Sequence, residues 1–434
     1  MKAQPDNDLP LFSGAALQAS ARFAGLGLAV LLARALGAHD YGIYAYAAAI
    51  MTVLLIFAEA GAPMLLMREA AAGTEHASWG RVRGALACAT KYVLAGGVIV
   101  CVLGLTLIWQ LGDALTAVES RTATLMLLTV PLAALSRTAA HALRGINRNL
   151  TGQFAEFLLR PALVLGLLAV VFYTLPEWRS PEIAMAGQLL AALAALAFGA
   201  LAFRRYMPAG IGRATPDYSN RIWLKNASPF VLMGAAGIIN GQADVIMLGW
   251  FAPLDEVGAY RAAVQLAVVV GFGLQVVGAL AAPRFAELHA RADAVGLQRL
   301  VTRSARLSLV AAIPAAAILA LAGGLVLGWI FGEAFSSAGV ALAVLAIGQL
   351  INAGLGAVGF LLTMTGHERE TARVLWQTTA LNVVLNLALI PLFGAVGAAI
   401  ASSTSLAIWN VVLARLAWRR LGLNTTAFHF QAQS

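Results

Sequence analysis

Two arginines of this 434-residue chain lie inside long apolar stretches of the sequence. Arg22 is near the middle of the apolar run 16–37, and Arg160 stands beside Pro161 in a second run. A guanidinium stays protonated, and its planar fork matches two phosphate oxygens at once. Both arginines are therefore candidate ligands for a phosphate-bearing anion. The alternative is a buried ion pair with a carboxylate.

Three carboxylates in apolar runs could be those partners: Glu59, Glu156 and Asp244. Glu156 precedes Arg160 by four residues, a spacing that places both on one helical face, so it could neutralise this arginine. Asp244 has a second interpretation, as a site for a coupling ion, H⁺ or Na⁺. Each carboxylate is thus either an ion-coupling residue or a structural buried charge.

Amide side chains accompany these charges at helical spacing. Gln18 shares a face with Arg22, Asn240 shares one with Asp244, and Asn382 and Asn386 are four residues apart. We expect Asn240, Asn382 and Asn386 to bind sugar hydroxyls or a coupling ion, and Gln18 to contribute to the substrate site beside Arg22. Interhelical hydrogen bonding is the alternative for all four amides. The Gly237-x-x-x-Gly241 spacing on the same face as Asn240 favours close helix packing.

The composition shows what elements must position these residues. Hydrophobic residues make up 60% of the chain and charged residues 11%, with a mean hydropathy of +0.81, whereas soluble domains carry about 25% charged residues. The chain is predicted to be an all-α integral membrane protein, because alternating barrel-type strands are missing. Twelve spans are predicted, at 11–36, 43–67, 84–109, 122–143, 150–173, 183–203, 226–252, 258–282, 307–330, 338–362, 374–391 and 395–418.

Basic residues set the expected orientation. Most of the 29 lysines and arginines fall on one side if both termini are cytoplasmic. The formal net charge of +9 is then explained by topology and by attraction to anionic lipid headgroups, and no nucleic acid partner is expected.

The chain contains an internal repeat. "LARALGAHDYGIYAYA" and "LGWFAPLDEVGAYRAA" align at a shift of 216 residues, which pairs Gly42 with Gly258, and "LRGINR" aligns with "MTGHER" at a shift of 221. These echoes predict two six-helix bundles, 1–212 and 213–434. Because six is even, they are parallel repeats, with a substrate cavity expected between them.

Catalytic and metal-binding patterns are missing from the sequence. The three lysines lack the glycine pattern of an ATP-binding loop, the six histidines form no H-x-x-x-H pair, and Cys88 and Cys101 match no metal spacing. We therefore expect a transporter and not an enzyme, with no cofactor and no metal, driven by H⁺, Na⁺ or the membrane potential. Moving a dianion to the positive side at 100 mV releases about 4.6 kcal/mol.

Three segments together resemble a known family: "LARALGAHDYGIYAYA", "FAEAGAPMLLMREAA" and "LKNASPF" followed by "GQADVIMLGWFAPLDEVGAYRAA". They are similar to the oligosaccharide and polysaccharide flippases of the multidrug/oligosaccharidyl-lipid/polysaccharide (MOP) superfamily. The resemblance implies a V-shaped, alternating-access transporter. Its implied substrate is an undecaprenyl-diphosphate-linked oligosaccharide, moved from the cytoplasmic to the outer leaflet of the bacterial inner membrane for surface polysaccharide biosynthesis.

The resemblance also implies partners and leaves two alternatives open. A polysaccharide polymerase and a chain-length regulator are the implied protein partners. A cation-coupled multidrug exporter would share the fold, but a central Arg22 argues against a site for cationic drugs. A peptidoglycan lipid-precursor flippase would usually carry two further helices, which the sequence does not show.

Overall fold

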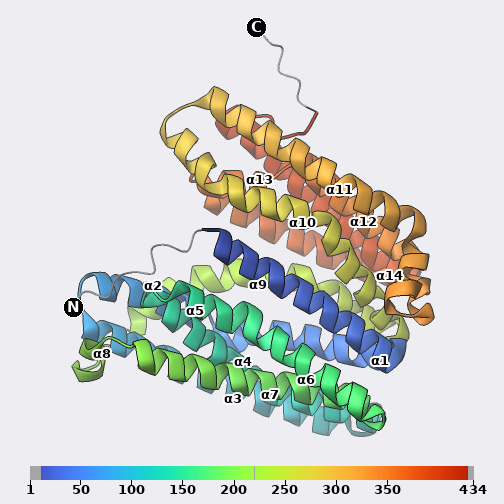
Figure 1. Cartoon of the computed structure of the whole chain (residues 1–434), viewed down its shortest axis with the longest axis horizontal. Coiled ribbons are helices and arrows are strands. Elements are labelled where there is room, and N and C mark those ends of the chain that lie inside the picture. Colours follow the sequence, from blue (N-terminus) through green and yellow to red (C-terminus); the bar gives the residue numbers. More distant parts are fainter. Residues whose placement is uncertain (1–10, 219, 429–434) are drawn as a thin grey trace. The chain divides into compact units, whose positions relative to one another are not determined.

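A computed structural model describes residues 11–218 and 220–428; within its helices, the side chains of 11–16, 18–19, 113, 220–222 and 224–233 lie outside the description. Every regular element in the described residues is helical (Figure 1). The long helices are α1 (Leu11–Glu59), α2 (Ala62–Glu75), α3 (Trp79–Leu111), α4 (Ala117–Gly145), α6 (Arg160–Thr174), α7 (Pro181–Tyr206), α9 (Asn220–Phe251), α10 (Leu254–Ala290), α11 (Ala294–Phe331), α12 (Gly339–Leu355) and α14 (Glu368–Leu421). Shorter helices are α5 (Asn149–Gln153), α8 (Ala209–Arg213) and α13 (Val358–Met364), and the short segments are η1 (Gly112–Ala114), η2 (Phe154–Leu159), η3 (Pro176–Trp178) and η4 (Glu333–Ala338).

The described helices have the length and apolarity of membrane spans. Nine of them qualify on both criteria, and two of these nine each cover two predicted spans. α1 breaks at Gly37 and α14 breaks at Gly394, where positive φ angles of 79° and 53° interrupt the helix. The left-handed region is readily open to glycine, which has no Cβ. The chain is an all-α, multi-pass membrane protein, as the sequence predicts.

Three predicted spans are less regular than expected. The span 43–67 is interrupted after Glu59, where Ala60 and Gly61 have φ angles of 43° and 74°. The span 338–362 is divided into α12 and α13 at Gly356, whose φ is 79°. Hydropathy alone gives no sign of these breaks, because the residues on both sides remain apolar.

The third irregular span, 150–173, contains the π-helical segment η2 between α5 and α6. Pro161 is the second residue of α6, after Arg160, and has no N–H to donate to a carbonyl of the preceding turn. A π-helical turn admits one extra residue and rotates the side chains that follow, and such turns are frequent at functional sites. The segment carries Glu156 and leads into Arg160.

The chain divides into two compact units. The first contains the chain up to Leu36 together with Ala47–Ile238, and the second contains Gly37–Tyr46 and the chain from Ile239 onward. The division falls inside α9 and assigns a short piece of α1 to the second unit. The sequence-based boundary at 212/213 stays a prediction.

Each unit has its own buried apolar cluster. In the first unit Leu143, Ile146 and Ile211 pack with Ala70 and Val82. In the second unit a larger cluster joins α10, α11, α13 and α14; it contains Phe285, Leu297, Leu361, Leu362 and Leu413. These clusters fix the helices that carry the polar residues described below.

The polar stretch between α7 and α9 is attached to the first unit. Arg83 donates to the carbonyl oxygens of Gly212 and Ala214 at 3.0 and 2.7 Å, and the backbone N–H of Asp217 donates to the Gly80 carbonyl at 3.0 Å. A Cβ on Gly84 would overlap the Asp217 carbonyl, so this approach requires glycine. The connection is therefore held along the first turns of α3.

Candidate functional site

Charged side chains from three elements of the first unit form a continuous ionic cluster. Arg137 of α4 lies between two carboxylates, with Nη1 3.0 Å from Glu59 Oε1 and Nε 3.7 Å from Glu156 Oε1. Arg144, two turns further along α4, places Nη1 3.3 Å from Glu156 Oε2. Glu156 is thus shared by two arginines, and Glu59 ties the end of α1 to the same group.

The local structure explains how these residues meet. Arg137, His141 and Arg144 share one face of α4, since they are four and three residues apart. His141 is buried, and its Nδ1–H donates to the Arg137 carbonyl at 2.9 Å. The break after Glu59 places this carboxylate at a helix end, and the π-helical turn carries Glu156. Two irregular backbone segments therefore present the two acids to one regular helix.

Arg160 makes different contacts from those expected. Its Nη2 donates to Gln188 Oε1 of α7 at 3.2 Å, and it has a further interaction as well. The ion pairs of Glu156 are with Arg137 and Arg144, although the sequence offered Glu156 as a neutraliser of Arg160. Arg160 begins α6, directly after the π-helical segment that carries Glu156.

The arginines are the more exposed members of this cluster. Side-chain exposure is 33% for Arg137 and 22% for Arg144, but 13% and 11% for Glu59 and Glu156. The guanidinium groups are therefore more accessible than the carboxylates. An anion that approaches from the open side meets the guanidinium edges first.

Arg22 is separate from these ion pairs. Its side chain is exposed, and it forms no ion pair or hydrogen bond within the part of the chain that the structure describes. Gly25 is one turn away on the same helix, and a Cβ on it would meet no described atom within 4 Å. Glu59, which the sequence offered as a possible ion-pair partner of Arg22, forms its ion pair with Arg137. Gln18 lies outside the described side chains.

The second unit contains a hydrogen-bonded network around Asp244. This buried carboxylate accepts from the Tyr260 hydroxyl of α10 at 2.7 Å and from the Ser402 hydroxyl of α14 at 3.3 Å, both through Oδ2. Its Oδ1 accepts from the Val245 backbone N–H at 2.8 Å. No basic side chain forms an ion pair with Asp244 among the described residues, so its charge is held by neutral donors.

Asn382 and Asn386 extend this network along α14. Asn386 Nδ2 donates to Asn382 Oδ1 at 3.0 Å, and Asn382 Nδ2 lies 3.5 Å from Ser402 Oγ. Both amides are buried, with 1% and 0% exposure. Asn386 Oδ1 is buried and has no hydrogen-bond donor among the described residues. In this state the two amides face Asp244 through Ser402, and their predicted role in sugar binding remains a prediction.

Asn240 is half-buried, one turn before Asp244. A Cβ on Gly237 or Gly241 would meet no described atom within 4 Å, so close helix packing at this pair stays a prediction. Asp244, in contrast, is buried. Two glycines at this spacing leave room for a second helix, but they do not by themselves bring one close.

Sequence reasoning missed five members of these clusters: Arg137, Arg144, Gln188, Tyr260 and Ser402. The two arginines were assigned to the cytoplasmic ends of helices, which explained their charge without a partner. Their spacing with His141 on one face of α4 was the signal available. Ser402 gave no signal, because a serine hydroxyl in an apolar helix commonly bonds to its own backbone. Tyr260 gave none for this role, because its distance from Asp244 in the sequence does not show that the two side chains meet.

Long apolar helices with charged and amide groups enclosed in two helical units define a polytopic membrane transporter. Residues 12–289 match the family described as polysaccharide biosynthesis protein, which is more than half of the chain. The chain belongs to this family.

Two curated relatives from Haloferax volcanii are similar in sequence. The probable low-salt glycan biosynthesis flippase Agl15 is 27% identical over 199 residues, which are 46% of this chain and 42% of the relative. The probable flippase AglR is 30% identical over 177 residues, 40% of this chain and 37% of the relative. The chain therefore matches less than half the length of these relatives.

Solved structures share the fold. An inward-facing multidrug resistance MATE family transporter of the MOP superfamily matches with a TM-score of 0.78 and 13% identity, over 94% of this chain and 98% of that one. The lipid II flippase MurJ, in an inward closed conformation, matches with a TM-score of 0.70 and 12% identity, over 93% of this chain and 87% of that one. The fold is thus that of the MOP superfamily, and these two neighbours carry different substrates on it.

Proposed function

We propose that this protein is a flippase that moves an undecaprenyl-diphosphate-linked oligosaccharide from the cytoplasmic to the outer leaflet of a bacterial inner membrane. It would supply repeat units for surface polysaccharide biosynthesis and act as a transporter, not as an enzyme. The observation that carries the proposal is Arg22, an exposed arginine in a membrane-spanning helix that forms no ion pair among the described residues. A lipid-borne diphosphate is the anion that such a group would receive.

The ionic cluster of the first unit supports an anionic substrate. Arg137 and Arg144 present partly exposed guanidinium groups that Glu59 and Glu156 hold in place. A diphosphate could share these guanidinium groups without displacing the acids, because each guanidinium offers five N–H donors. Family membership and the two probable glycan flippases among the relatives agree with this substrate class.

The same residues bear on the two alternative functions. A multidrug exporter for cationic compounds would need exposed carboxylates, but Glu59 and Glu156 are paired with arginines and Asp244 is buried. A peptidoglycan lipid-precursor flippase would also bind a diphosphate, so the charged residues do not separate it from our proposal. Competition between the two lipid-linked substrates would separate them.

Asp244 is our candidate for ion coupling. Its network brings oxygen atoms of Asp244, Ser402, Asn382 and Asn386 together from α9 and α14, and Asn386 Oδ1 has no hydrogen-bond donor within the described part of the chain. Oxygen ligands suit Na⁺ as a hard cation, and a carboxylate held only by neutral donors can also accept H⁺. We propose that either ion binds here, with Asp244 as the charged ligand.

The proposed setting follows from the basic residues. Both termini would be cytoplasmic, and a polysaccharide polymerase and a chain-length regulator would act on the product at the outer leaflet. The carrier is proposed to be undecaprenyl, although the curated relatives named above are archaeal. An assay with a bacterial and an archaeal polyprenyl carrier would compare the two directly.

Reconstituted transport tests the proposal. Purified protein in liposomes that contain a fluorescent undecaprenyl-diphosphate oligosaccharide should expose the label to a membrane-impermeant quencher, and this exposure should require the protein. Arg22→Ala should reduce the initial rate by about tenfold or more, because a charge-assisted contact to the diphosphate is lost. Arg22→Lys should retain part of the rate, since the charge remains but the planar fork does not.

Arg121→Ala is the matched control, since it removes one exposed positive charge from α4 at its opposite end from the ionic cluster. Its rate should stay within about twofold of the unmodified protein. Normal transport by Arg22→Ala at equal protein levels would exclude Arg22 as the anion ligand. Absence of any protein-dependent transport of this substrate, with transport of a cationic drug instead, would favour the exporter.

A further inference from the structure

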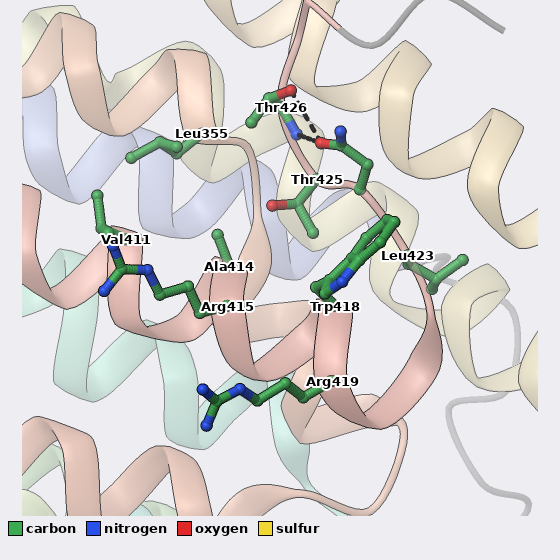
Figure 2. A pocket seen from close by; sticks show the side chains of 10 residues that line it. Leu355, Val411, Ala414, Arg415, Trp418, Arg419, Leu423, Thr425 and Thr426 are labelled. Atoms are coloured by element: carbon green, nitrogen blue, oxygen red, sulfur yellow. Dashed lines mark hydrogen bonds between the residues drawn. The ribbon is translucent and has the colours of Figure 1, made fainter.

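A pocket of about 440 Å³ lies where α14 ends and the chain turns back at Gly422 (Figure 2). Its charged residues are Arg415 and Arg419, one turn apart on α14. Its apolar residues are Leu355, Val411, Ala414, Trp418 and Leu423, and its polar residues are Asn424, Thr425 and Thr426. Two cations beside an apolar wall form an amphipathic site that neither the family nor the proposed transport explains.

Two features show that the positive charge of this pocket is unmatched. Arg415 and Arg419 are exposed, form no ion pair among the described residues, and no acidic side chain lines the pocket. The neighbouring Arg420, in contrast, is paired with Glu370. Like charges four residues apart on a helix repel each other and destabilise it slightly. An anion placed between them would remove this cost.

A buried hydroxyl supplies an independent sign of a ligand. Thr425 is 2% exposed and lines the pocket, yet its Oγ1 has no hydrogen-bond partner among the described residues. Figure 2 shows this hydroxyl on the side of Thr425 that faces Ala414. A buried polar atom without a partner destabilises the protein. A ligand oxygen in the pocket would satisfy it.

The wall that carries Thr425 is rigidly held. Gln298 of α11 donates to the Asn424 carbonyl at 2.7 Å and accepts from the Asn424 backbone N–H at 2.8 Å. The Ala427 backbone N–H donates to the Gly354 carbonyl at 3.0 Å, and the Ala427 carbonyl accepts from Arg306 Nε at 3.0 Å. The segment 423–427 therefore forms a preformed wall, so binding would require little ordering of the chain.

We propose that this pocket binds the headgroup of an anionic phospholipid. The lipid phosphate would lie between the guanidinium groups of Arg415 and Arg419, with a phosphate oxygen near the Thr425 hydroxyl. The glycerol and the start of an acyl chain would contact Leu355, Val411 and Trp418. The orientation proposed from the arginine distribution puts the pocket at the cytoplasmic leaflet. Tryptophan is common at the membrane–water interface, where a lipid headgroup lies.

The apolar wall and the two positive charges of the pocket restrict the class of ligand that it can bind. Inorganic phosphate would use the arginines but leave the wall exposed to water. A zwitterionic lipid would bring a cationic group toward two guanidinium groups, which repel it. An anionic lipid such as phosphatidylglycerol satisfies both parts of the pocket.

Native mass spectrometry of the full chain in detergent tests this proposal. The probes are phosphatidylglycerol, phosphatidylcholine with the same acyl chains, and inorganic phosphate. We expect one phosphatidylglycerol to bind more tightly than any further copies, and about tenfold more tightly than phosphatidylcholine. The double variant Arg415→Gln/Arg419→Gln should lose this preference. Thr425→Val keeps the shape and charge and should weaken phosphatidylglycerol binding by about threefold to tenfold.

The control is Arg299→Gln/Arg303→Gln, which removes two exposed arginines at the same spacing on α11, outside the pocket. This variant should keep the tight site. Equal loss in both double variants would mean general attraction to basic residues and would overturn the proposal, as would equal binding of phosphatidylcholine. Binding of inorganic phosphate that displaces phosphatidylglycerol at equal concentration would overturn the lipid assignment. Thr425→Val with unchanged binding would exclude the proposed position of the phosphate.

Discussion

Gly42 and Gly258 lie directly against each other in the second unit. A Cβ on Gly42 would be 3.2 Å from the Gly258 backbone nitrogen, and a Cβ on Gly258 would be 3.0 Å from the Gly42 nitrogen. Each Cβ would also overlap a carbonyl oxygen, that of Leu254 for Gly42 and that of Ala38 for Gly258. Both pairs of residues are related by the 216-residue shift of the internal repeat.

These contacts are reciprocal, which is the signature of a local two-fold axis. His39 and Asp255 are also separated by 216 residues, and their side chains form an ion pair at 3.3 Å. The two copies of the repeated motif therefore pack against each other around this axis. Glycine is required at the contact because the backbones approach too closely for any side chain.

The first prediction concerns this contact. Gly42→Ala and Gly258→Ala should each lower the free energy of unfolding by about 1–3 kcal/mol, because the new methyl group overlaps a backbone carbonyl. Thermal unfolding in detergent measures the change. Gly25→Ala is the matched control: its Cβ meets no described atom, and alanine favours a helix by up to about 1 kcal/mol. Stability unaffected by Gly42→Ala would show that the two segments can separate freely.

The His39–Asp255 pair should contribute little. Both side chains are about 60% exposed, and exposed ion pairs are worth about 0–1 kcal/mol. His39→Ala should therefore change the unfolding temperature by much less than Gly42→Ala in the same detergent. A larger effect of His39→Ala than of Gly42→Ala would show that the ion pair contributes more to stability at this axis than the glycine contact, contrary to our prediction.

The ionic cluster predicts a large effect at Glu156. Glu156→Gln leaves Arg144 without its carboxylate and Arg137 with one of its two, and should destabilise the protein by about 1–3 kcal/mol, less than a fully buried pair because both arginines are partly exposed. Arg144→Gln added to this variant should recover part of the loss. Glu287→Gln, which removes the exposed partner of Arg291, should cost about 0.5 kcal/mol at most.

Equal unfolding temperatures for Glu156→Gln and Glu287→Gln would mean that water screens the cluster fully. The cluster would then be a set of surface charges. Recovery by Arg144→Gln is the more specific result, because it requires that the two residues act on each other.

A substitution at Asp244 should abolish ion coupling without unfolding the protein. Asp244→Asn keeps an acceptor for Tyr260 and Ser402 but removes the charge, so transport should lose its response to an imposed H⁺ or Na⁺ gradient while the fold persists. Tyr260→Phe is the control; it should cost about 1 kcal/mol of stability through one lost hydrogen bond and should keep the ion response. Undiminished gradient dependence in Asp244→Asn would remove Asp244 as the coupling residue.

The helices follow from local features of the sequence. Apolar stretches of about 20 residues predict helices because a backbone in hydrocarbon must satisfy its own hydrogen bonds. The described helices lie where twelve spans were expected. Breaks inside apolar stretches were missed, at Ala60, Gly61 and Gly356, since hydropathy does not report backbone angles.

The repeat illustrates the same limit. The shift of 216 is confirmed in space by Gly42 and Gly258, but the second echo is displaced. The left-handed residues at the corresponding turns are Asn147 and Gly366, which are 219 residues apart, whereas Gly145 is helical and packs against Met67. The sequence alignment therefore paired Gly145 with Gly366, although the two glycines have different backbone conformations.

Which charges meet was decided by the tertiary structure alone. The sequence determined that Arg22, Glu59, Glu156 and Asp244 lie within membrane helices, because their apolar neighbours require it. It did not determine that Arg137 takes both glutamates, leaving Arg22 exposed. The choice of partner depends on how helices distant in sequence rotate and cross, and a few degrees of rotation or one π-helical turn moves a carboxylate from one arginine to another.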